Sequence, residues 1–281
     1  MEMEPGGRRF FRDPSFFLTA RPTLSMIIEI SPSQEEKAGM KLSERISRWI
    51  RDQVEAAGAA GVLFGLSGGI DSAVVAVLAR RAMGDNVLAL LLPCHSLAED
   101  ERDALVVADA FGIRRERVDL SPVYDAFLCQ LPDAGQMCQG NLKPRLRMTA
   151  LYYFANKLNY LVAGTGNKSE RLMGYFTKFG DGGADFLPIG DLTKSQVRKL
   201  AEELEIPPRI IDRPPSAGFW AGQTDEEEMN IRYEDLDKII ISLERRKEPK
   251  LPKTQMSYVK GMIARSRHKR STPPIFHLKS V

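Results

Sequence analysis

Short apolar runs alternate with longer stretches of helical spacing from about residue 34 to residue 163. Four short runs predict buried strands, at residues 61–66, 87–92, 117–120 and 160–163. The longer stretches predict helices at residues 34–57, 72–83, 101–111 and 145–159, and Ser121-Pro122 opens another. Strands separated by helices of this length favour an α/β fold, a doubly wound parallel sheet with flanking helices. Ligands of such sheets bind at the carboxyl ends of the strands.

Beyond Gly164 the pattern changes to loops rich in Gly and Pro, separated by capped helices. Thr193 precedes Gln196, and Thr224 precedes Glu227, by the three residues of a capping box. This spacing predicts helices at residues 194–204 and 225–246. The segment between them, residues 206–223, is too rich in Pro and Gly for regular structure, and we interpret it as an active-site lid.

Composition narrows the function classes. The chain has 281 residues, 27% of them charged, and a net charge of +3. This balance does not indicate a general nucleic-acid surface, so any anion site must be local. No apolar stretch is long enough to span a bilayer, and we expect neither a nucleic-acid nor a membrane partner.

The three cysteines, Cys94, Cys129 and Cys138, show no CxxC spacing. An odd number of widely spaced cysteines indicates reduced thiols, and hence a cytoplasmic location without a zinc site. Cys94 ends a predicted strand, where a nucleophile is conceivable, but a buried structural thiol is the favoured interpretation.

The chain length is typical of one large α/β domain with appendages. We expect residues 1–25 to be a disordered extension, with Met26 as an alternative start, and residues 26–281 to form a single domain.

The segment Ser67-Gly68-Gly69-Ile70-Asp71-Ser72 lies in the turn between a predicted strand and a predicted helix. Glycines let backbone N–H groups approach phosphate oxygens, and the helix start adds the positive end of its dipole. Ser67 and Ser72 can donate hydrogen bonds, and Asp71 can hold Mg²⁺. The segment lacks the Lys of a Walker loop and resembles the pyrophosphate loop of the ATP pyrophosphatases. This likeness implies a Rossmann-like fold of the adenine nucleotide alpha hydrolase type; the alternative is a plain turn with a capping Asp or Ser.

Three later features add candidate chemistry. Glu170 follows the small residues Gly164–Gly166, and it is either a second metal ligand or a residue that complements a helix dipole. Residues 175–186 mix aromatic, hydroxyl, Lys and Asp side chains among glycines, which favours a ligand-binding loop over a surface turn. Lys194 near a helix start is disfavoured by the dipole, so its position suggests an anionic partner.

Four blocks stand in the order found in NAD synthetases: residues 67–72, 164–170, 174–185 and 215–226. The chain resembles that family from about residue 40 to residue 275. The resemblance implies that ATP adenylylates the carboxylate of deamido-NAD with release of pyrophosphate, and that ammonia then displaces AMP to form NAD.

The resemblance also implies roles for individual residues. ATP would bind to Gly65, Leu66, Ser67, Gly68, Gly69, Ile70, Asp71 and Ser72, and to Thr165, Lys194 and Ser216. Asp71 and Glu170 would hold Mg²⁺, and Lys194 would stabilise charge at the α-phosphate, so Asp71 and Lys194 are the candidate catalytic residues. Deamido-NAD would bind to Arg145, Lys178, Asp185, His268 and Lys269.

Two departures from the family pattern are visible. Asn230 stands where the family commonly has Gly, and residues 93–99 only loosely resemble its Ser-rich loop. The family is homodimeric, which implies a homodimer here. The roughly forty residues before the first helix are too few for an amidase domain, so we expect free ammonia or ammonia from a separate glutaminase.

Other functions remain as alternatives. A different ATP pyrophosphatase could be a GMP-synthetase-like amidating enzyme or a tRNA-modifying enzyme, but the latter is expected to carry a basic surface or paired cysteines. A non-catalytic nucleotide-binding protein could share the fold. The carboxylates of Asp71 and Glu170, together with Lys194, argue against that last class.

Overall fold

A computed structural model describes residues 39–216, 222–246 and 251–278. The predicted extension at residues 1–25 and the alternative start at Met26 lie outside these residues. Contacts divide the chain into Met1–Met40 and Lys41–Val281, and the second unit carries every element below.

Four parallel strands form the sheet, in the order β3-β2-β1-β4. They are β1 (Gly61–Gly65), β2 (Val87–Leu91), β3 (Arg115–Arg117) and β4 (Tyr160–Val162). Side chains alternate between the two faces of a strand, so Val62 and Phe64 of β1 enter one apolar cluster and Leu63 enters the other.

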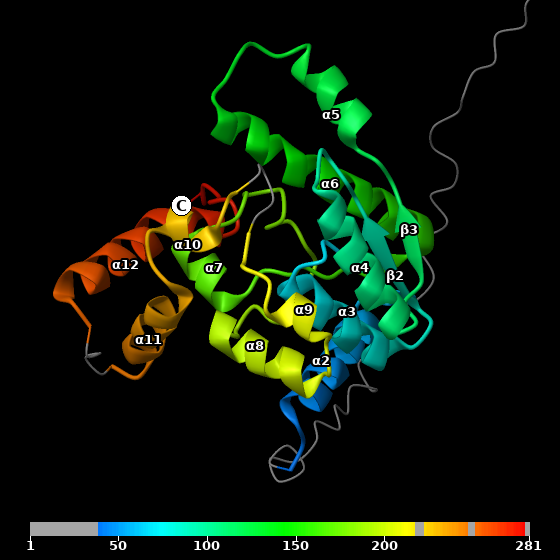
Figure 1. The fold of residues 1–281 in the computed structure, drawn as a ribbon, viewed down its shortest axis with the longest axis horizontal. Coiled ribbons are helices and arrows are strands. Elements are labelled where there is room, and N and C mark those ends of the chain that lie inside the picture. The colour runs from blue at the N-terminus through cyan, green and yellow to red at the C-terminus, as the bar shows by residue number, and fades with distance from the viewer. Residues whose placement is uncertain (1–38, 217–221, 247–250, 279–281) are drawn as a thin grey trace, which may run out of the picture. The chain divides into compact units, whose positions relative to one another are not determined.

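Helices cover both faces of the sheet, as Figure 1 shows. The cluster around Val62 and Phe64 includes residues of α2 (Leu42–Ala56), α3 (Ile70–Met83), α4 (Ala98–Ala110), α8 (Lys194–Glu203) and α9 (Pro208–Ile211). The cluster around Leu63 includes residues of α5 (Ser121–Leu128) and α6 (Gln136–Leu158). This arrangement confirms the doubly wound parallel sheet.

A third apolar cluster lies outside the sheet layers. It joins α7 (Lys168–Met173), α10 (Asp225–Met229), α11 (Tyr233–Glu244) and α12 (Lys253–Arg265), and η2 (Ser266–Lys269) follows α12. Met173, Leu236 and Val259 are fully or almost fully buried there. The C-terminal helices are therefore anchored to α7, which follows β4.

Several predicted boundaries are wrong. Strand β3 spans residues 115–117 instead of 117–120, because its backbone pairs with residues 89–91 of β2. Its side chains are exposed, and the apolar run behind the prediction begins only at Val118. The pairing nevertheless continues past the assigned strand, since the N–H groups of Val118 and Leu120 donate to Leu91 and Pro93.

Two helices also differ from prediction. Helix α6 begins at Gln136 rather than at residue 145 and contains Pro144, which is buried inside it. The predicted helix at residues 225–246 is two helices, because Asn230 adopts a left-handed conformation (φ 50°) between α10 and α11. Helix α2 starts at Leu42, and the part of its prediction before residue 39 lies outside the described residues.

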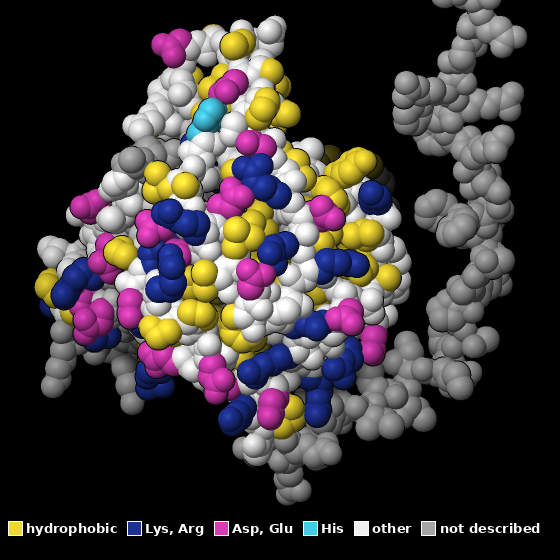
Figure 2. All heavy atoms as spheres, turned by 45° about the vertical axis from the view of Figure 1, so that its right-hand side comes forward, with side chains coloured by type: hydrophobic (Ala, Val, Ile, Leu, Met, Phe, Trp, Pro, Cys, Tyr) yellow, Lys and Arg dark blue, Asp and Glu magenta, His cyan; other side chains and the backbone are white. Residues whose placement is uncertain are grey.

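Among the described residues, no helix combines the length and the apolar character that a membrane crossing needs. On the face seen in Figure 2, Lys and Arg side chains are interspersed with Asp and Glu.

Candidate active site

The loop between β1 and α3 is closed by its own serines. Ser72 Oγ donates to Gly69 O (2.9 Å) and lies 3.1 Å from Ser67 Oγ, and the Ser67 N–H donates to Ser72 Oγ (3.2 Å). Gly68 has φ +81°, and a Cβ atom there would lie 2.4 Å from the carbonyl oxygen of Asp100. Only glycine fits this position, because a side chain would meet the start of α4. The loop follows the carboxyl end of β1, one of the two inner strands, where a phosphate ligand is expected.

Three charged side chains meet beside this loop. Lys194 Nζ, from the first residue of α8, lies 2.5 Å from Asp71 Oδ2 and 3.2 Å from Glu170 Oε1. All three side chains are less than one-fifth exposed. Lys194 thus has an anionic partner in the structure, the carboxylate pair of Asp71 and Glu170.

Asn167 fixes the two carboxylates in place. Its side chain is fully buried, donates from Nδ2 to Asp71 Oδ1 (3.0 Å), and accepts from the Glu170 N–H (3.0 Å). Because the Asn167 N–H also contacts Glu170 Oε2 (3.4 Å), Glu170 caps the start of α7. One carboxylate oxygen of Glu170 therefore serves the helix start, and the other faces Lys194. The role of Glu170 as a metal ligand stays a prediction.

Burial and mutual contact shift the pKa values of the charged groups in this cluster. Burial raises the pKa of the Glu170 carboxyl to about 8, against the opposing pull of Lys194. Burial alone would lower the pKa of Lys194, but the charges of Asp71 and Glu170 outweigh it and raise that pKa overall. Perturbed groups gathered at a strand end are typical of functional sites.

Two residues of this cluster have no role in the sequence-based interpretation. The hydroxyl of Tyr233 donates to Asp225 Oδ2 (2.9 Å) and lies 3.3 Å from Glu170 Oε1. Lys194 Nζ stands 5.0 Å from the centre of the Tyr233 ring. Asp225 is 4% exposed, and burial raises its pKa. Asp225 lies in the block at residues 215–226 and at a predicted helix start, whereas Tyr233 carries no sequence signal of its own.

The candidate metal ligands form a pair rather than a complete cage. In the described part of the chain, no group of three or more His, Cys, Asp or Glu side chains is arranged to hold a metal ion. Two carboxylates are nevertheless a suitable protein contribution for Mg²⁺, which often takes its remaining ligands from water and substrate phosphates.

A second cluster brings together four of the five residues expected to bind deamido-NAD. Lys178 Nζ donates to His268 O (2.8 Å), and Arg145 Nη2 donates to Lys178 O (3.4 Å). Lys269 Nζ donates to Gly174 O (2.8 Å) and lies 5.4 Å from the ring centre of Phe176. The cluster unites α6, the loop after α7 and η2, which supports a binding loop at residues 175–186.

Asp185 contacts other groups. Its carboxylate accepts from the Val162 N–H (2.7 Å) and from the hydroxyl of Tyr152 (3.0 Å), so it is held at the end of β4.

Thr165 is half-buried in the loop between β4 and α7. Ser216 is exposed and is the last described residue before the gap at 217–221. Residues 217–221 of the predicted lid therefore lie outside the described residues. The expectation of no regular structure is wrong for its first part, where α9 spans Pro208–Ile211. Its first part is anchored instead of open, because Arg209 and Arg213 form ion pairs with Asp103, and Arg213 also pairs with Asp100.

Cys94 is fully buried, and burial raises the pKa of its thiol. This confirms the structural interpretation, since a reactive thiol needs a lowered pKa. Arg147 holds the adjoining loop by donating to Leu92 O (3.0 Å) and Ser96 Oγ (3.1 Å).

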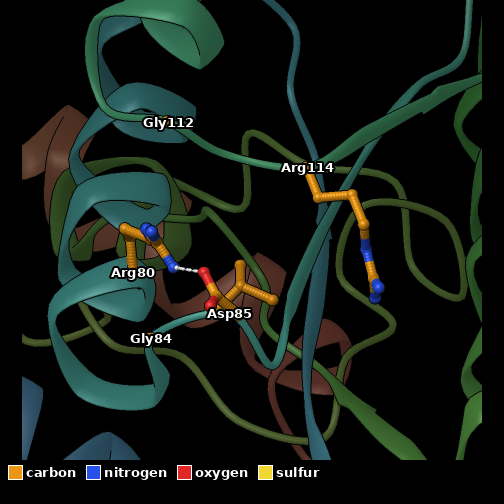
Figure 3. A pocket seen from close by; sticks show the side chains of 6 residues that line it. Arg80, Gly84, Asp85, Gly112 and Arg114 are labelled. Carbon is orange, nitrogen blue, oxygen red and sulfur yellow. Dashed lines mark hydrogen bonds and ion pairs between the residues drawn. The ribbon is translucent and has the colours of Figure 1, made fainter.

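A hollow of about 160 Å³ lies elsewhere, where α3 ends and β2 begins (Figure 3). Its lining includes Arg114 and an ion pair of Arg80 with Asp85 (2.5 Å). It lies at the amino ends of the strands, opposite the loop at residues 67–72, and none of the candidate site residues lines it.

The fold and the charged cluster at the end of β1 define an α/β protein of the adenine nucleotide alpha hydrolase fold, which its solved structural neighbours share. A family model described as NAD synthase matches residues 42–273, and the chain belongs to this family.

Individual relatives agree with this assignment. The chain is 46% identical to an NH(3)-dependent NAD(+) synthetase from Archaeoglobus fulgidus, with 86% of this chain and 98% of the relative covered. It is similar to the structure of an NMN synthetase from Francisella tularensis (TM-score 0.78, 38% identity, 84% of this chain and 98% of that one). It is also similar to an NH3-dependent NAD synthetase from Campylobacter jejuni (TM-score 0.74, 32% identity, 84% and 97%).

Proposed function

We propose that the chain converts deamido-NAD to NAD, using ATP and ammonia and releasing AMP and pyrophosphate. The observation that carries this proposal is the contact of Lys194 with Asp71 and Glu170 beside the loop at residues 67–72, in a chain of the NAD synthase family. Other amidating or tRNA-modifying ATP pyrophosphatases and a non-catalytic binder are not favoured by this membership.

The proposed reaction has two steps. A carboxylate oxygen of deamido-NAD attacks the α-phosphorus of ATP, and pyrophosphate leaves. Ammonia then attacks the acyl carbon, and AMP leaves with the oxygen. The first step is needed because a carboxylate is a poor electrophile until one of its oxygens can leave with phosphate.

Residues of the first cluster serve the phosphates of ATP. The N–H groups and hydroxyls of residues 65–72 bind phosphate oxygens, with Thr165 and Ser216 adding hydroxyls. Lys194 stabilises the charge that develops at the α-phosphate. Asp71 and Glu170 would hold Mg²⁺, which supplies positive charge to the phosphates when bound.

Residues of the second cluster hold the acceptor. Deamido-NAD carries two phosphates and a carboxylate, and Arg145, Lys178, His268 and Lys269 provide a local basic surface for them. Asp185, at the end of β4, binds a polar group of the same substrate.

The test is an assay of purified protein with ATP, Mg²⁺ and either ammonium or glutamine, with NAD, AMP and pyrophosphate all quantified. Turnover of deamido-NAD with ammonium, at one AMP per NAD, is expected, and Asp71→Asn should abolish it. Absence of NAD with both nitrogen donors would overturn the proposal. Nicotinic acid mononucleotide is assayed in parallel, because one similar structure is an NMN synthetase.

Three further proposals concern partners and location. Ammonia comes from solution or from a separate glutaminase. All three cysteines are free thiols, which supports a reducing, cytoplasmic location. The chain forms a homodimer, and exposed apolar side chains at α5 and the start of α6 support this, since monomers rarely expose such clusters. In Figure 1, α5 and the loop that follows it lie at the top of the view, beyond the labelled strands.

A further inference from the structure

Asp237 of α11 lies beside the candidate site. Its hydrogen-bond partners, Ser169 and Ser195, are neighbours of the residues proposed to bind ATP or Mg²⁺. Its carboxylate is 3% exposed and makes three hydrogen bonds. Oδ1 accepts from the hydroxyl of Ser169 (2.5 Å), and Oδ2 accepts from both the N–H (2.8 Å) and the hydroxyl (2.6 Å) of Ser195. One carboxylate therefore joins the starts of α7 and α8 to α11.

The bonded residues are the immediate neighbours of the site residues. Ser169 precedes Glu170, and Ser195 follows Lys194. Ser169 Oγ also accepts from the backbone N–H of Lys194 (3.1 Å), so the link runs directly between the two segments. This junction ties the residue before Glu170 to the backbone of Lys194 and of Ser195, so it bears directly on the separation of the Glu170 and Lys194 side chains.

The electrostatics favour a negative charge at this place. The first N–H groups of α8 have no partner within the helix, and a carboxylate satisfies one of them while complementing the helix dipole. The geometry is strongly held, because a buried carboxylate that loses such partners is left as an unpaired charge.

We infer that Asp237 is a positioning residue for the proposed adenylylation, setting the distance between Glu170 and Lys194 so that Lys194 reaches the α-phosphate. This inference rests on the proposed function. A displacement of about 1 Å at such a site can cost on the order of 100-fold in rate.

Helix α11 supplies a matched control. Asp235 is also buried, at 7% exposure, but its carboxylate pairs with Arg232 (3.0 Å) on its own side of the helix. Asp235→Asn and Asp237→Asn therefore remove the same charge from the same helix, and only the second breaks the link to Glu170 and Lys194.

The experiment compares kcat, the KM values for ATP and for deamido-NAD, and thermal stability for these two variants. Asp237→Asn is expected to lower kcat by about 10- to 100-fold. Its KM for deamido-NAD should stay within about twofold, because the basic cluster is held by other elements. Asp235→Asn should keep kcat within about twofold of the parent protein. Equal loss of kcat in both variants, or a loss that follows stability alone, would overturn the inference.

Two further measurements test the inference. The first does not depend on which acceptor the protein uses, and the second does not require Asp237→Asn to fold. Affinity for α,β-methylene-ATP with Mg²⁺ needs no acceptor, and it should weaken in Asp237→Asn and not in Asp235→Asn. If the parent protein binds this analogue but makes no NAD, the proposed function fails while the inference is still decided by binding.

Ser169→Ala is the milder variant if Asp237→Asn does not fold. Ser169→Ala should also lower kcat. Where Asp237→Asn folds, the variant that combines Ser169→Ala with Asp237→Asn should be no slower than Asp237→Asn alone, because both changes break one network. Additive losses would assign the two residues to independent roles and overturn the shared link.

Discussion

The single residue Lys194 is the counter-ion of two carboxylates that would otherwise repel each other. Its ammonium group is buried between Asp71 and Glu170, and their charges raise its pKa. Lys194→Met should therefore lower the free energy of unfolding by about 3 kcal/mol, because it leaves buried carboxylates without their cation. Urea unfolding measures the loss, with the exposed Lys199→Met on the same helix as control.

The same variant tests the metal assignment without an activity assay. If Asp71 and Glu170 can hold Mg²⁺, millimolar Mg²⁺ should recover part of the stability of Lys194→Met and raise that of the parent protein less. An equal effect of Mg²⁺ on both proteins would contradict the assignment of these carboxylates as metal ligands.

At Asp225, burial outweighs the neighbouring charges, whereas at Lys194 the charges outweigh burial. Burial raises the pKa of the Asp225 carboxyl, although Lys194 and the Tyr233 hydroxyl both lower it. A raised pKa means that the folded protein binds this proton more tightly than the unfolded chain. The ionised carboxylate therefore costs stability, and the cost grows as the pH rises above the ordinary Asp pKa of about 3.9. Such a cost is typical of functional sites.

Asp225→Asn should remove this pH-dependent cost. The variant should become more stable than the parent protein as the pH rises from about 4 to 7, because Asn cannot ionise. Denaturant unfolding at several pH values in this range checks it, with the exposed Glu116→Gln as control for loss of one charge. A difference in stability that does not change with pH would contradict the prediction.

At the scale of elements, the joint between α10 and α11 depends on the left-handed conformation of Asn230 (φ 50°, ψ 35°). Asn tolerates this conformation better than other residues with a Cβ atom, and Gly adopts it freely. Asn230 can therefore stand where the family commonly has Gly.

Substitutions of Asn230 should measure what the left-handed conformation costs a residue that has a Cβ atom. Asn230→Ala is expected to lower the free energy of unfolding by about 1 kcal/mol, and Asn230→Gly to leave it within about 0.5 kcal/mol. Thermal unfolding of both, beside Asn86→Ala at an exposed turn, measures the difference. Equal stability of the Ala and Gly variants would show that the left-handed conformation costs nothing.

The elements that sequence predicts best are those with a strong local signal. β1 and β2 are continuous apolar runs, and Thr193 and Thr224 mark the starts of α8 and α10. β3 is exposed, and α6 passes through a proline, so their boundaries depend on tertiary contacts that no local pattern contains.

The site divides in the same way. Asp71 and Lys194 stand out in the sequence because a carboxylate in a glycine loop and a lysine at a helix start are unusual. Tyr233 and Asp237 look like ordinary positions of an amphipathic helix. Their contacts with Glu170, Ser169 and Ser195 join residues 42 to 68 positions apart, and only the packing of α11 on α7 and α8 brings them together.

At the scale of the whole molecule, the proposed homodimer makes use of a surface that the monomer leaves uncovered. Val123, Phe127, Leu131 and Met137 are between 46% and 55% exposed, and all belong to α5, the start of α6 or the loop between them. The opposite side of α6 is not available for an interface, since Leu146, Leu151 and Phe154 pack against the core. An interface centred on α5 would therefore bury apolar side chains without disturbing the sheet.

Charge placed at this surface should split the dimer and leave the fold intact. Phe127→Lys combined with Met137→Lys is expected to convert a dimer into a monomer, because an interface cannot bury unpaired ammonium groups. Sedimentation equilibrium measures the mass, and circular dichroism checks the fold. Leu97→Lys, at a similarly exposed apolar residue beside α4, should stay dimeric. A parent protein that sediments as a monomer would contradict the homodimer. A double variant that remains dimeric would place the interface on another surface.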